Sequence, residues 1–359
     1  MEQYLKGLTL DELDKIICRI LGTEQSSKPN FRTLQLLKWI YSKYQDDPCL
    51  FTDLSKDLRQ KIAQNFKLRS LELVEYQNSK ISESIKFAYK TFDGEIVESV
   101  LMKHPDRYTL CISSQVGCNV GCIFCASGAM GLKRNLHVHE IVEQFFLSQK
   151  FIYEKEGKRI SNIVFMGMGE PLINYHNVVK AIVIFNSPWG FNISKRNITL
   201  STSGIEKRIY DLVRDGVRVK LALSLHSPFQ EQREKLIPTA KKYDINSLLK
   251  AVENYYQNTK KRITIEYILL KDINDTVEHA KKLVSLLKQY SMKVLINLIP
   301  YNSIGNVYFE DKLLEEPDIS RIQRFQNIIK EHFEVSVRWS LGRDIDAACG
   351  QLRRKILSC

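Results

Sequence analysis

The sequence predicts an α/β protein: a parallel sheet curved into a partial (β/α) barrel, preceded by a small helical N-terminal domain and a short antiparallel β ribbon. Three observations predict this fold class. Residues 8–66 show short helical periodicity, residues 70–114 alternate with a period of two, and apolar runs then alternate with helical stretches as far as residue 339. Such alternation is typical of a parallel sheet, and a barrel of this kind can absorb about 250 residues as one body.

The helical N-terminal domain is expected at residues 1–68 and the β ribbon at residues 69–104. The domain contains three helical patterns, which are a run headed by Thr9, then Phe31–Tyr44 and Leu54–Phe66. Period-two alternation then predicts four strands, at Leu71–Tyr76, Ser84–Tyr89, Glu95–Met102 and Tyr108–Ser113. Between two of these strands, Phe92-Asp93-Gly94 is a good hairpin turn.

The barrel is expected at residues 105–345, followed by a C-terminal loop and tail at 346–359. Helices are predicted at His137–Lys155, Tyr175–Phe185, Ile205–Arg214, Ile245–Tyr256, Val277–Tyr290 and Ile319–His332. Apolar runs predict strands between them at Ile163–Met166, Ile198–Leu200, Val219–Leu223, Ile263–Leu270, Val294–Ile299 and Val335–Trp339. With the strand before Cys118, this order predicts the parallel sheet of the barrel.

Composition is that of a globular protein with an excess of basic residues. Hydrophobic residues make up 44% and charged residues 26% of the 359 residues, so a disordered or fibrous chain is excluded. The net charge of +12 would attract a polyanion through phosphate contacts and counterion release. Solvated surface lysines explain the same excess equally well, so charge alone does not identify RNA as a partner.

The beginning of the chain does not resemble a secretory signal. The first twenty residues carry four acidic residues and a helical pattern, in place of a basic start followed by an apolar block. No apolar run approaches the length of a membrane span. We therefore expect a cytoplasmic location and no membrane partner. In a reducing compartment, eight cysteines favour metal or redox chemistry over structural disulfides.

Three of the cysteines, Cys118, Cys122 and Cys125, lie within eight residues in the pattern C-x3-C-x2-C. Zinc usually takes four nitrogen or sulfur ligands, and no second cysteine or histidine pair follows here. A ferredoxin would supply four cysteines for each cluster. Three thiolates on one tight loop fit a [4Fe–4S] cluster with one iron left open. An RNA-binding module in which these cysteines hold a structural metal is the alternative of another class.

Polar residues follow the predicted strands one after another. They lie in Met166–Pro171, Ser201–Gly204, Ser224–His226 and Tyr301-Asn302. Any one of these stretches is weak evidence, because glycine after a strand is normally a turn and a lone histidine is normally a satisfied hydrogen-bonding residue. In a barrel, however, the loops after the strands converge on one face, so the four stretches together predict a single site.

The C-x3-C-x2-C pattern resembles the signature of the radical SAM superfamily, and the similarity extends over about residues 105–345. The resemblance implies a partial (β/α) barrel of the radical SAM type, in which the open iron binds S-adenosylmethionine (SAM). It also implies the residues that hold SAM, namely Gly169, Glu170, Ser201, Ser224, Leu225, His226 and Asn302.

Longer motifs resemble those of the RlmN/Cfr family of RNA adenine methyltransferases, and of its C2-specific branch in particular. These motifs are Leu110–Cys118, Phe165–Leu172, Leu223–His226 and Asp344–Leu352. The N-terminal domain, with Phe31-Arg32 and Trp39–Tyr41, is also similar to that of the family. The resemblance therefore covers nearly the whole chain.

The family resemblance gives roles to three further residues. It implies that one SAM methylates Cys349 and that a second is cleaved to a radical, which takes hydrogen from that methyl group so that the carbon adds to the adenine ring. Glu98 matches the base that removes the ring proton. Cys111 then attacks as the protein–RNA link breaks, leaving a Cys111–Cys349 disulfide that must be reduced in each cycle.

The implied product is 2-methyladenosine, in 23S rRNA at the peptidyl-transferase region and in tRNA next to the anticodon. The C8-specific branch shares the catalytic residues, but Pro171, Asn174-Tyr175 and Pro300 look more like the C2 branch, and C8 methylation of 23S rRNA stays the alternative. Arg343 stands where relatives often have an acidic residue. The implied partners are 23S rRNA, tRNA and an electron-donating reductase system, and a monomer is expected. No role is assigned to Cys18, Cys49 or Cys359.

Overall fold

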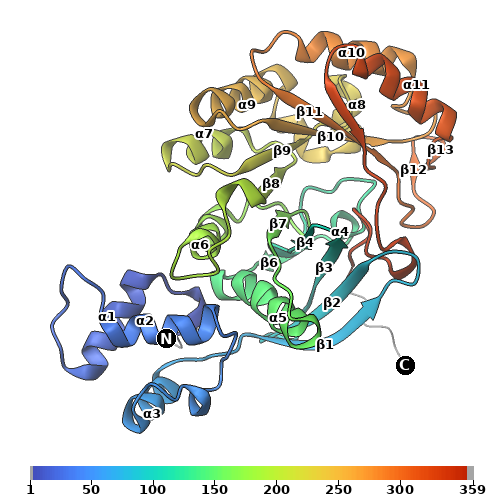
Figure 1. Ribbon diagram of the computed structural model, residues 1–359. Helices are drawn as coiled ribbons and strands as arrows, with labels where there is room; N and C mark the ends of the chain where they lie inside the picture. Colours follow the sequence, from blue (N-terminus) through green and yellow to red (C-terminus); the bar gives the residue numbers. More distant parts are fainter. Residues whose placement is uncertain (1–2, 354–359) are drawn as a thin grey trace.

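The computed structural model describes residues 3–353, so Arg354 to Cys359, the last six residues of the predicted C-terminal loop and tail, lie outside the described residues. Its main feature is a ten-stranded sheet in the order β1-β2-β3-β4-β7-β8-β9-β10-β11-β14 (Figure 1). The strands from β4 to β14 run parallel, and those from β1 to β4 run antiparallel. The predicted α/β fold with a partial barrel is confirmed.

The N-terminal helices lie beside α5, to one side of the barrel (Figure 1). They are α1 (Leu10–Leu21), α2 (Phe31–Tyr41) and α3 (Lys56–Asn65), with 3₁₀ turns at Leu5–Gly7 and Pro48–Leu50. Thr9 and Glu12 form a capping box that starts α1, and Gly22 ends it with a φ of 66°. The predicted Phe31–Tyr44 helix ends three residues early, because the chain turns at Tyr44 with a φ of 54°.

The predicted ribbon strands are β1 (Leu71–Asn78), β2 (Ser84–Thr91) and β3 (Ile96–His104). The turn around Asp93 forms as expected, with the Gly94 N–H donating to the Thr91 carbonyl at 3.0 Å. β3 also pairs with β4 (Arg107–Cys111), so the ribbon is continuous with the main sheet. The opposite end of the sheet is β14, and the barrel is open.

The parallel part of the sheet alternates with helices as predicted. Its further strands are β7 (Asn162–Phe165), β8 (Ile198–Thr202), β9 (Lys220–Ser224), β10 (Ile263–Leu269), β11 (Val294–Pro300) and β14 (Glu334–Val337). The long helices are α5 (Val138–Glu156), α6 (Tyr175–Asn186), α7 (Glu206–Arg214), α9 (Ile245–Thr259), α10 (Val277–Leu287) and α11 (Ile319–Lys330). They lie outside the curved sheet, which leaves the inner side for the site (Figure 1).

Several short elements have no counterpart among the predictions. They are α4 (Ala126–Ala129), α8 (Gln230–Leu236), the β5 (Gln115–Gly117) and β6 (Leu132–Asn135) pair, the β12 (Tyr308–Phe309) and β13 (Lys312–Leu313) pair, and 3₁₀ turns at Lys195–Asn197, Pro238–Lys242 and Arg343–Ile345. Unlike the short strands of the barrel, these elements are not apolar runs between helical stretches, so neither hydrophobicity nor a period reveals them.

The buried side chains form one large core and two small clusters. The large core is continuous from Leu5 through the barrel to Ile329. One small cluster surrounds the cysteine loop and includes Cys118 and Phe124, and the other joins Cys111 to Leu352 of the C-terminal loop. The small clusters therefore attach the cysteine loop and the C-terminal loop to the inner side of the barrel.

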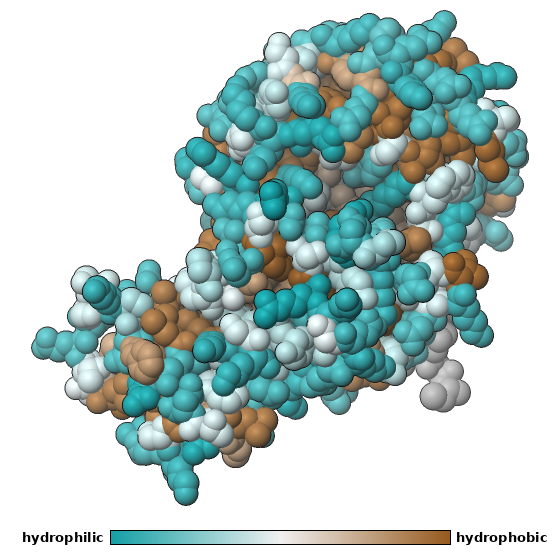
Figure 2. Space-filling model, viewed as in Figure 1, coloured by the Kyte–Doolittle hydropathy of each residue, from teal (hydrophilic) through white to brown (hydrophobic). Residues whose placement is uncertain are grey.

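The visible surface is mainly hydrophilic, with hydrophobic side chains showing in the hollow of the upper half (Figure 2). Within residues 3–353, none of the helices is long and apolar enough to cross a membrane.

Candidate active site

The cysteine loop begins where β5 ends and turns tightly into α4. Gly117 has a φ of 77°, and a Cβ at this position would lie 1.9 Å from the carbonyl oxygen of Gly131. Only glycine therefore fits immediately before Cys118. Within the loop, the Cys125 N–H donates to the carbonyl of Cys122 at 3.1 Å, which brings two of the three cysteines onto one turn.

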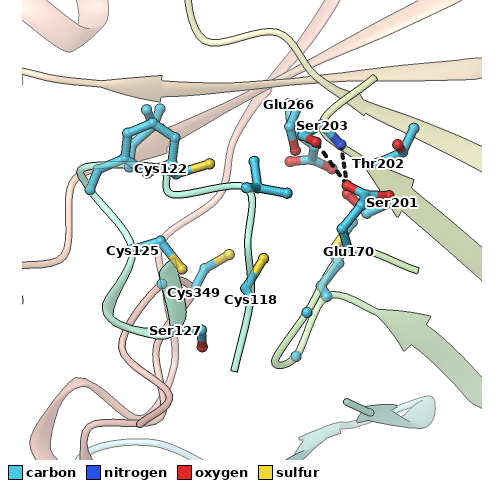
Figure 3. A pocket seen from close by; sticks show the side chains of 18 of the residues that line it. Cys118, Cys122, Cys125, Ser127, Glu170, Ser201, Thr202, Ser203, Glu266 and Cys349 are labelled. Atoms are coloured by element: carbon cyan, nitrogen blue, oxygen red, sulfur yellow. Dashed lines mark hydrogen bonds between the residues drawn. The ribbon is translucent and has the colours of Figure 1, made fainter. Parts of the chain in front are cut away.

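Cys118, Cys122 and Cys125 line one cavity, and their thiols lie around its hollow (Figure 3). Burial raises the pKa of all three thiols, that of Cys118 to about 12, so they need a cationic partner to become thiolates. Within the described part of the chain, no group of three metal-ligating side chains is arranged to hold a metal ion. Three soft sulfur donors on one short loop are the ligand type that iron–sulfur clusters take.

The carboxyl ends of the strands supply the rest of the cavity wall. Gly169 and Glu170 follow β7, Ser201 lies at the end of β8, Ser224 ends β9, and His226 comes two residues later; all five line the cavity. Because parallel strands end at the same edge of a sheet, residues far apart in the sequence meet here. The predicted convergence of these strand-end residues on one site is observed.

Glu170 is the most tightly held of these residues. Its carboxylate accepts from the N–H and hydroxyl of Ser203, at 2.7 and 2.9 Å (Figure 3). It also accepts from the N–H of Leu172 at 3.0 Å. Burial raises the pKa of Glu170, and these donors oppose the rise. Gly169 has a φ of 98°, and a Cβ there would lie 2.5 Å from a carbon of Gln115, so backbone rather than side chain approaches the cavity.

His226 adopts the left-handed backbone region, with a φ of 60°. Its Nδ1 accepts from the N–H of Ile268 at 3.0 Å, so the neutral ring carries its proton on Nε2. Burial, helped by the positive charge of Arg233, lowers its pKa to about 3. His226 is therefore a fixed hydrogen-bond donor in the cavity and does not take up a proton near pH 7.

Two residues predicted to hold SAM are not among those that line the cavity. Leu225 is fully buried, and its N–H donates to the carbonyl of Glu266 at 3.1 Å. The side-chain amide of Asn302 donates to the Ser340 hydroxyl at 2.8 Å and to the Cys349 carbonyl at 3.2 Å, while its oxygen is buried without a hydrogen-bond partner. In this structure Asn302 therefore supports the loop that carries Cys349.

Cys349 lines the cysteine-loop cavity and also a second, smaller cavity, which contains Cys111. The C-terminal loop is fixed there because the Ala126 N–H donates to the Gly350 carbonyl and the Ser127 hydroxyl to the Leu352 carbonyl, both at 2.7 Å. Burial raises the pKa of Cys111 to about 12. Both Cys111 and Cys349 are free thiols, so the disulfide expected between them is not supported.

Glu98 lies on β3 and is fully buried. One carboxylate oxygen accepts from the Arg353 N–H at 2.8 Å; the other lies 3.6 Å from Lys86 Nζ and has no hydrogen-bond partner. Burial raises the pKa of Glu98 to about 7, and Lys86 and the Arg353 N–H limit the rise. Glu98 does not line either cavity, but the Arg353 contact places it beside the C-terminal loop.

Three cavity residues had no individual role predicted for them, although Ser203 lies in the predicted stretch Ser201–Gly204. Ser203 holds Glu170, Glu266 on β10 accepts from Asn297 at 2.9 Å, and Arg338 follows β14. Glu266 could have been found as the one carboxylate in the apolar run Ile263–Leu269, and Arg338 as the one cation in Val335–Trp339. Ser203 gives no comparable signal, because serine is common after a strand.

Two family models match the chain. The model of the radical SAM superfamily matches residues 112–287, and that of the ribosomal RNA large subunit methyltransferase N-terminal domain matches residues 5–68. A crystal structure of a radical SAM methyltransferase from Sphaerobacter thermophilus superposes with a TM-score of 0.91 at 38% identity, over 98% of this chain and 100% of that one.

Curated relatives are similar over almost the whole length. Two are named "Probable dual-specificity RNA methyltransferase RlmN". The protein from Dictyoglomus thermophilum is 45% identical over 91% of both chains, and that from Thermotoga neapolitana is 43% identical over 98% of this chain and 97% of its own. The protein is thus an enzyme that methylates RNA and uses a [4Fe–4S] cluster and SAM. The chain belongs to the RlmN/Cfr family of radical SAM RNA methyltransferases.

Proposed function

We propose that this enzyme forms 2-methyladenosine in 23S rRNA, at the peptidyl-transferase region, and in tRNA next to the anticodon, through an S-methylcysteine at Cys349. One observation carries the proposal: Cys349 lines both the cavity of the cysteine loop and the cavity that contains Cys111. A residue in that place can receive a carbon on one side and deliver it on the other.

The cofactor residues are proposed from the cavity and from the family motifs. Cys118, Cys122 and Cys125 would hold the cluster, and SAM would be held by Gly169, Glu170, Ser201, Ser224, Leu225, His226 and Asn302. When bound, the cluster and SAM supply the methyl group and the one-electron chemistry that an electron-poor ring carbon requires. Asn302 and Leu225 are the least supported of these residues, because they do not line the cavity.

Cys349 would accept the methyl group and carry its carbon to the base. The small residues Ala347, Ala348 and Gly350 surround it, and Gly350 has a φ of 86°, which suits a loop that must adjust. The adenine must leave its stack to reach this sulfur, which is the general requirement for chemistry on a nucleic-acid base.

Glu98 would remove the proton from the ring carbon. Its pKa of about 7 makes it a base matched to neutral pH, and one of its oxygens has no hydrogen-bond partner to displace. Cys111 would then release the product from Cys349, which oxidises the pair of sulfurs. An electron-donating reductase system would restore the free thiols.

Nucleoside analysis tests the product directly. Digested 23S rRNA and tRNA, treated anaerobically with the reconstituted enzyme, are expected to contain 2-methyladenosine by mass spectrometry. The C8-specific alternative predicts 8-methyladenosine in 23S rRNA, and finding it as the sole product would contradict the proposal. Pro171, Asn174-Tyr175 and Pro300 favour the C2 product.

The domain division and the working state are also proposals. We propose a helical accessory domain at residues 1–68, a ribbon at 69–104, a barrel at 105–345 and a catalytic-cysteine loop and tail at 346–359, the first supported by the family model over residues 5–68. A monomer in the cytoplasm, where its RNA substrates are, completes the proposal. Light scattering after size exclusion, at micromolar protein, tests the monomer.

A further inference from the structure

Arg233 on α8 is a fully buried cation that the reaction described so far does not use. Its Nε donates to the carbonyl of Leu225 at 3.2 Å. Its Nη2 donates to the carbonyls of Ser203 and Ser224, at 2.5 and 3.4 Å. The guanidinium of Arg233 therefore links, by hydrogen bonds, the segment that follows β8 to the segment at the end of β9. These segments contain several of the residues proposed to hold SAM.

The positive charge of Arg233 has no carboxylate in ion-pair contact among the described residues, and its Nη1 is buried without any hydrogen-bond partner. Burial lowers the pKa of Arg233 to about 10, and the charges of Cys122 and Glu234 oppose the fall, so the side chain is still charged at pH 7. An uncompensated buried charge is costly. Such a residue implies that negative charge enters the site when the enzyme is complete.

The cysteine loop is where that charge would appear. The Ile123 N–H, between Cys122 and Cys125, donates to the carbonyl of Leu236 at the end of α8, at 3.1 Å. The helix that carries Arg233 is thereby tied to the loop. Three thiolates bring three negative charges, which an iron–sulfur core offsets only in part, and one-electron reduction adds a further negative charge.

We propose that Arg233 is a positioning residue with two effects: it holds the segments around SAM through three carbonyls, and it supplies the positive charge that favours the reduced cluster. The inference rests on the proposal that Cys118, Cys122 and Cys125 hold the cluster. Arg233 would contact neither the RNA nor the reacting carbon, and would act only through the residues and the cluster beside it.

The test compares Arg233→Met and Arg233→Lys with the unmodified enzyme, all reconstituted anaerobically. The cluster midpoint potential is measured by redox titration followed by electron paramagnetic resonance, and SAM binding by equilibrium dialysis. Arg233→Met is expected to shift the potential to more negative values and to weaken SAM binding at least tenfold. Arg233→Lys keeps the positive charge but loses the planar guanidinium that donates to three carbonyls. The midpoint potential should therefore stay near that of the unmodified enzyme, while SAM binding weakens.

Arg321→Met is the matched control, because Arg321 also fixes a segment but is paired with Asp275 at 2.7 and 2.8 Å. It is expected to lower stability without moving the potential. If Arg233→Met is folded, carries full iron and matches the unmodified enzyme in potential and SAM binding, the inference is wrong. If Arg233→Met does not fold, Arg233→Lys decides: weakened SAM binding at an unchanged potential supports the inference, and any other result overturns it. Failure of the unmodified enzyme to bind iron would instead refute the cluster ligands.

Discussion

Cys349 is the residue on which the proposed chemistry depends most, and it can be separated from cofactor binding. Replacing Cys349 by alanine removes the carbon carrier but leaves the cysteine loop unchanged, so we expect no methylated RNA with unchanged iron and sulfide content. The measurement is nucleoside mass spectrometry alongside iron analysis. Cys49→Ala is the control, because Cys49 is exposed and has no proposed role, and it should retain full activity. Methylation by Cys349→Ala would contradict the two-step mechanism.

Glu98 should make both activity and stability depend on pH near 7. As a base it must be ionised, so activity should rise with pH through about 7, and Glu98→Gln should remove most activity. Its pKa is raised on folding, so between about 4.5 and 7 the folded state binds more protons than the unfolded state, and stability falls as the pH rises through this window.

Chemical denaturation at pH 5 and pH 8 checks the stability part of that prediction. The rise from 4.5 to about 7 corresponds to roughly 3 kcal/mol lost between the two ends of the window. Glu98→Gln cannot ionise and should show a smaller loss between the two pH values than the unmodified enzyme. An identical pH dependence in both proteins would show that Glu98 has an ordinary pKa.

At the scale of single residues, a site residue could be predicted from the sequence where it belongs to a distinctive motif. It could not be predicted where its role depends on contacts that form only in the folded protein. Cys118 and Glu170 were found because their spacing and neighbours are distinctive. Arg233 was not, because an arginine in a short polar segment is normally a solvated surface residue. Its burial depends on α8 folding against two strand ends, which no local pattern predicts.

At the scale of elements, the cysteine loop depends on the backbone freedom of Gly117. Gly117→Ala combines a φ of 77° with a contact of 1.9 Å to the Gly131 carbonyl, so the loop must shift. We expect loss of most of the bound iron and a destabilisation of more than about 3 kcal/mol. Iron content after reconstitution and urea denaturation are the measurements.

Gly157→Ala separates the two causes in that prediction. Gly157 has a φ of 64°, but nothing lies within 4 Å of an added Cβ. This variant therefore carries the backbone strain alone, and we expect a loss of about 1 kcal/mol with normal iron content. Equal iron loss in both variants would show that the clash at Gly117 is unimportant.

The long elements of the barrel could be predicted because burial on one face imposes a period. The predicted helix Ile319–His332 is observed at Ile319–Lys330, and the predicted strand Val294–Ile299 is observed at Val294–Pro300. The strand predicted at Val335–Trp339 is observed at Glu334–Val337, and Trp339 beyond its end is about half exposed. An apolar residue at the end of such a run can therefore extend the predicted strand without being buried in it.

At the scale of the whole molecule, the attachment of the N-terminal helices to the barrel was not predictable. Besides the shared hydrophobic core, it includes Lys6, whose Nζ donates to Glu143 Oε1 on α5 at 2.8 Å and to the carbonyl of Leu68 at 2.5 Å, and lies 3.4 Å from Asp46. Both ion pairs are almost completely buried. Lysine is normally exposed, so a sequence gives no reason to place one in a core.

Lys6→Met tests how far this buried network holds the two parts of the molecule together. The substitution keeps most of the side-chain volume and removes the charge, which leaves the buried carboxylate of Glu143 with only the N–H and hydroxyl of Ser70 as donors. Breaking a buried pair on one side costs about 3–5 kcal/mol, so we expect a loss of this size in urea denaturation. Lys61→Met removes an exposed pair with Asp57 and should cost less than about 1 kcal/mol. Activity at low temperature, where the variant stays folded, distinguishes two roles for the N-terminal helices. If they only pack against α5, the Lys6→Met enzyme should methylate folded RNA substrates at the unmodified rate. If they position the RNA, the KM for RNA should rise while SAM binding is unchanged.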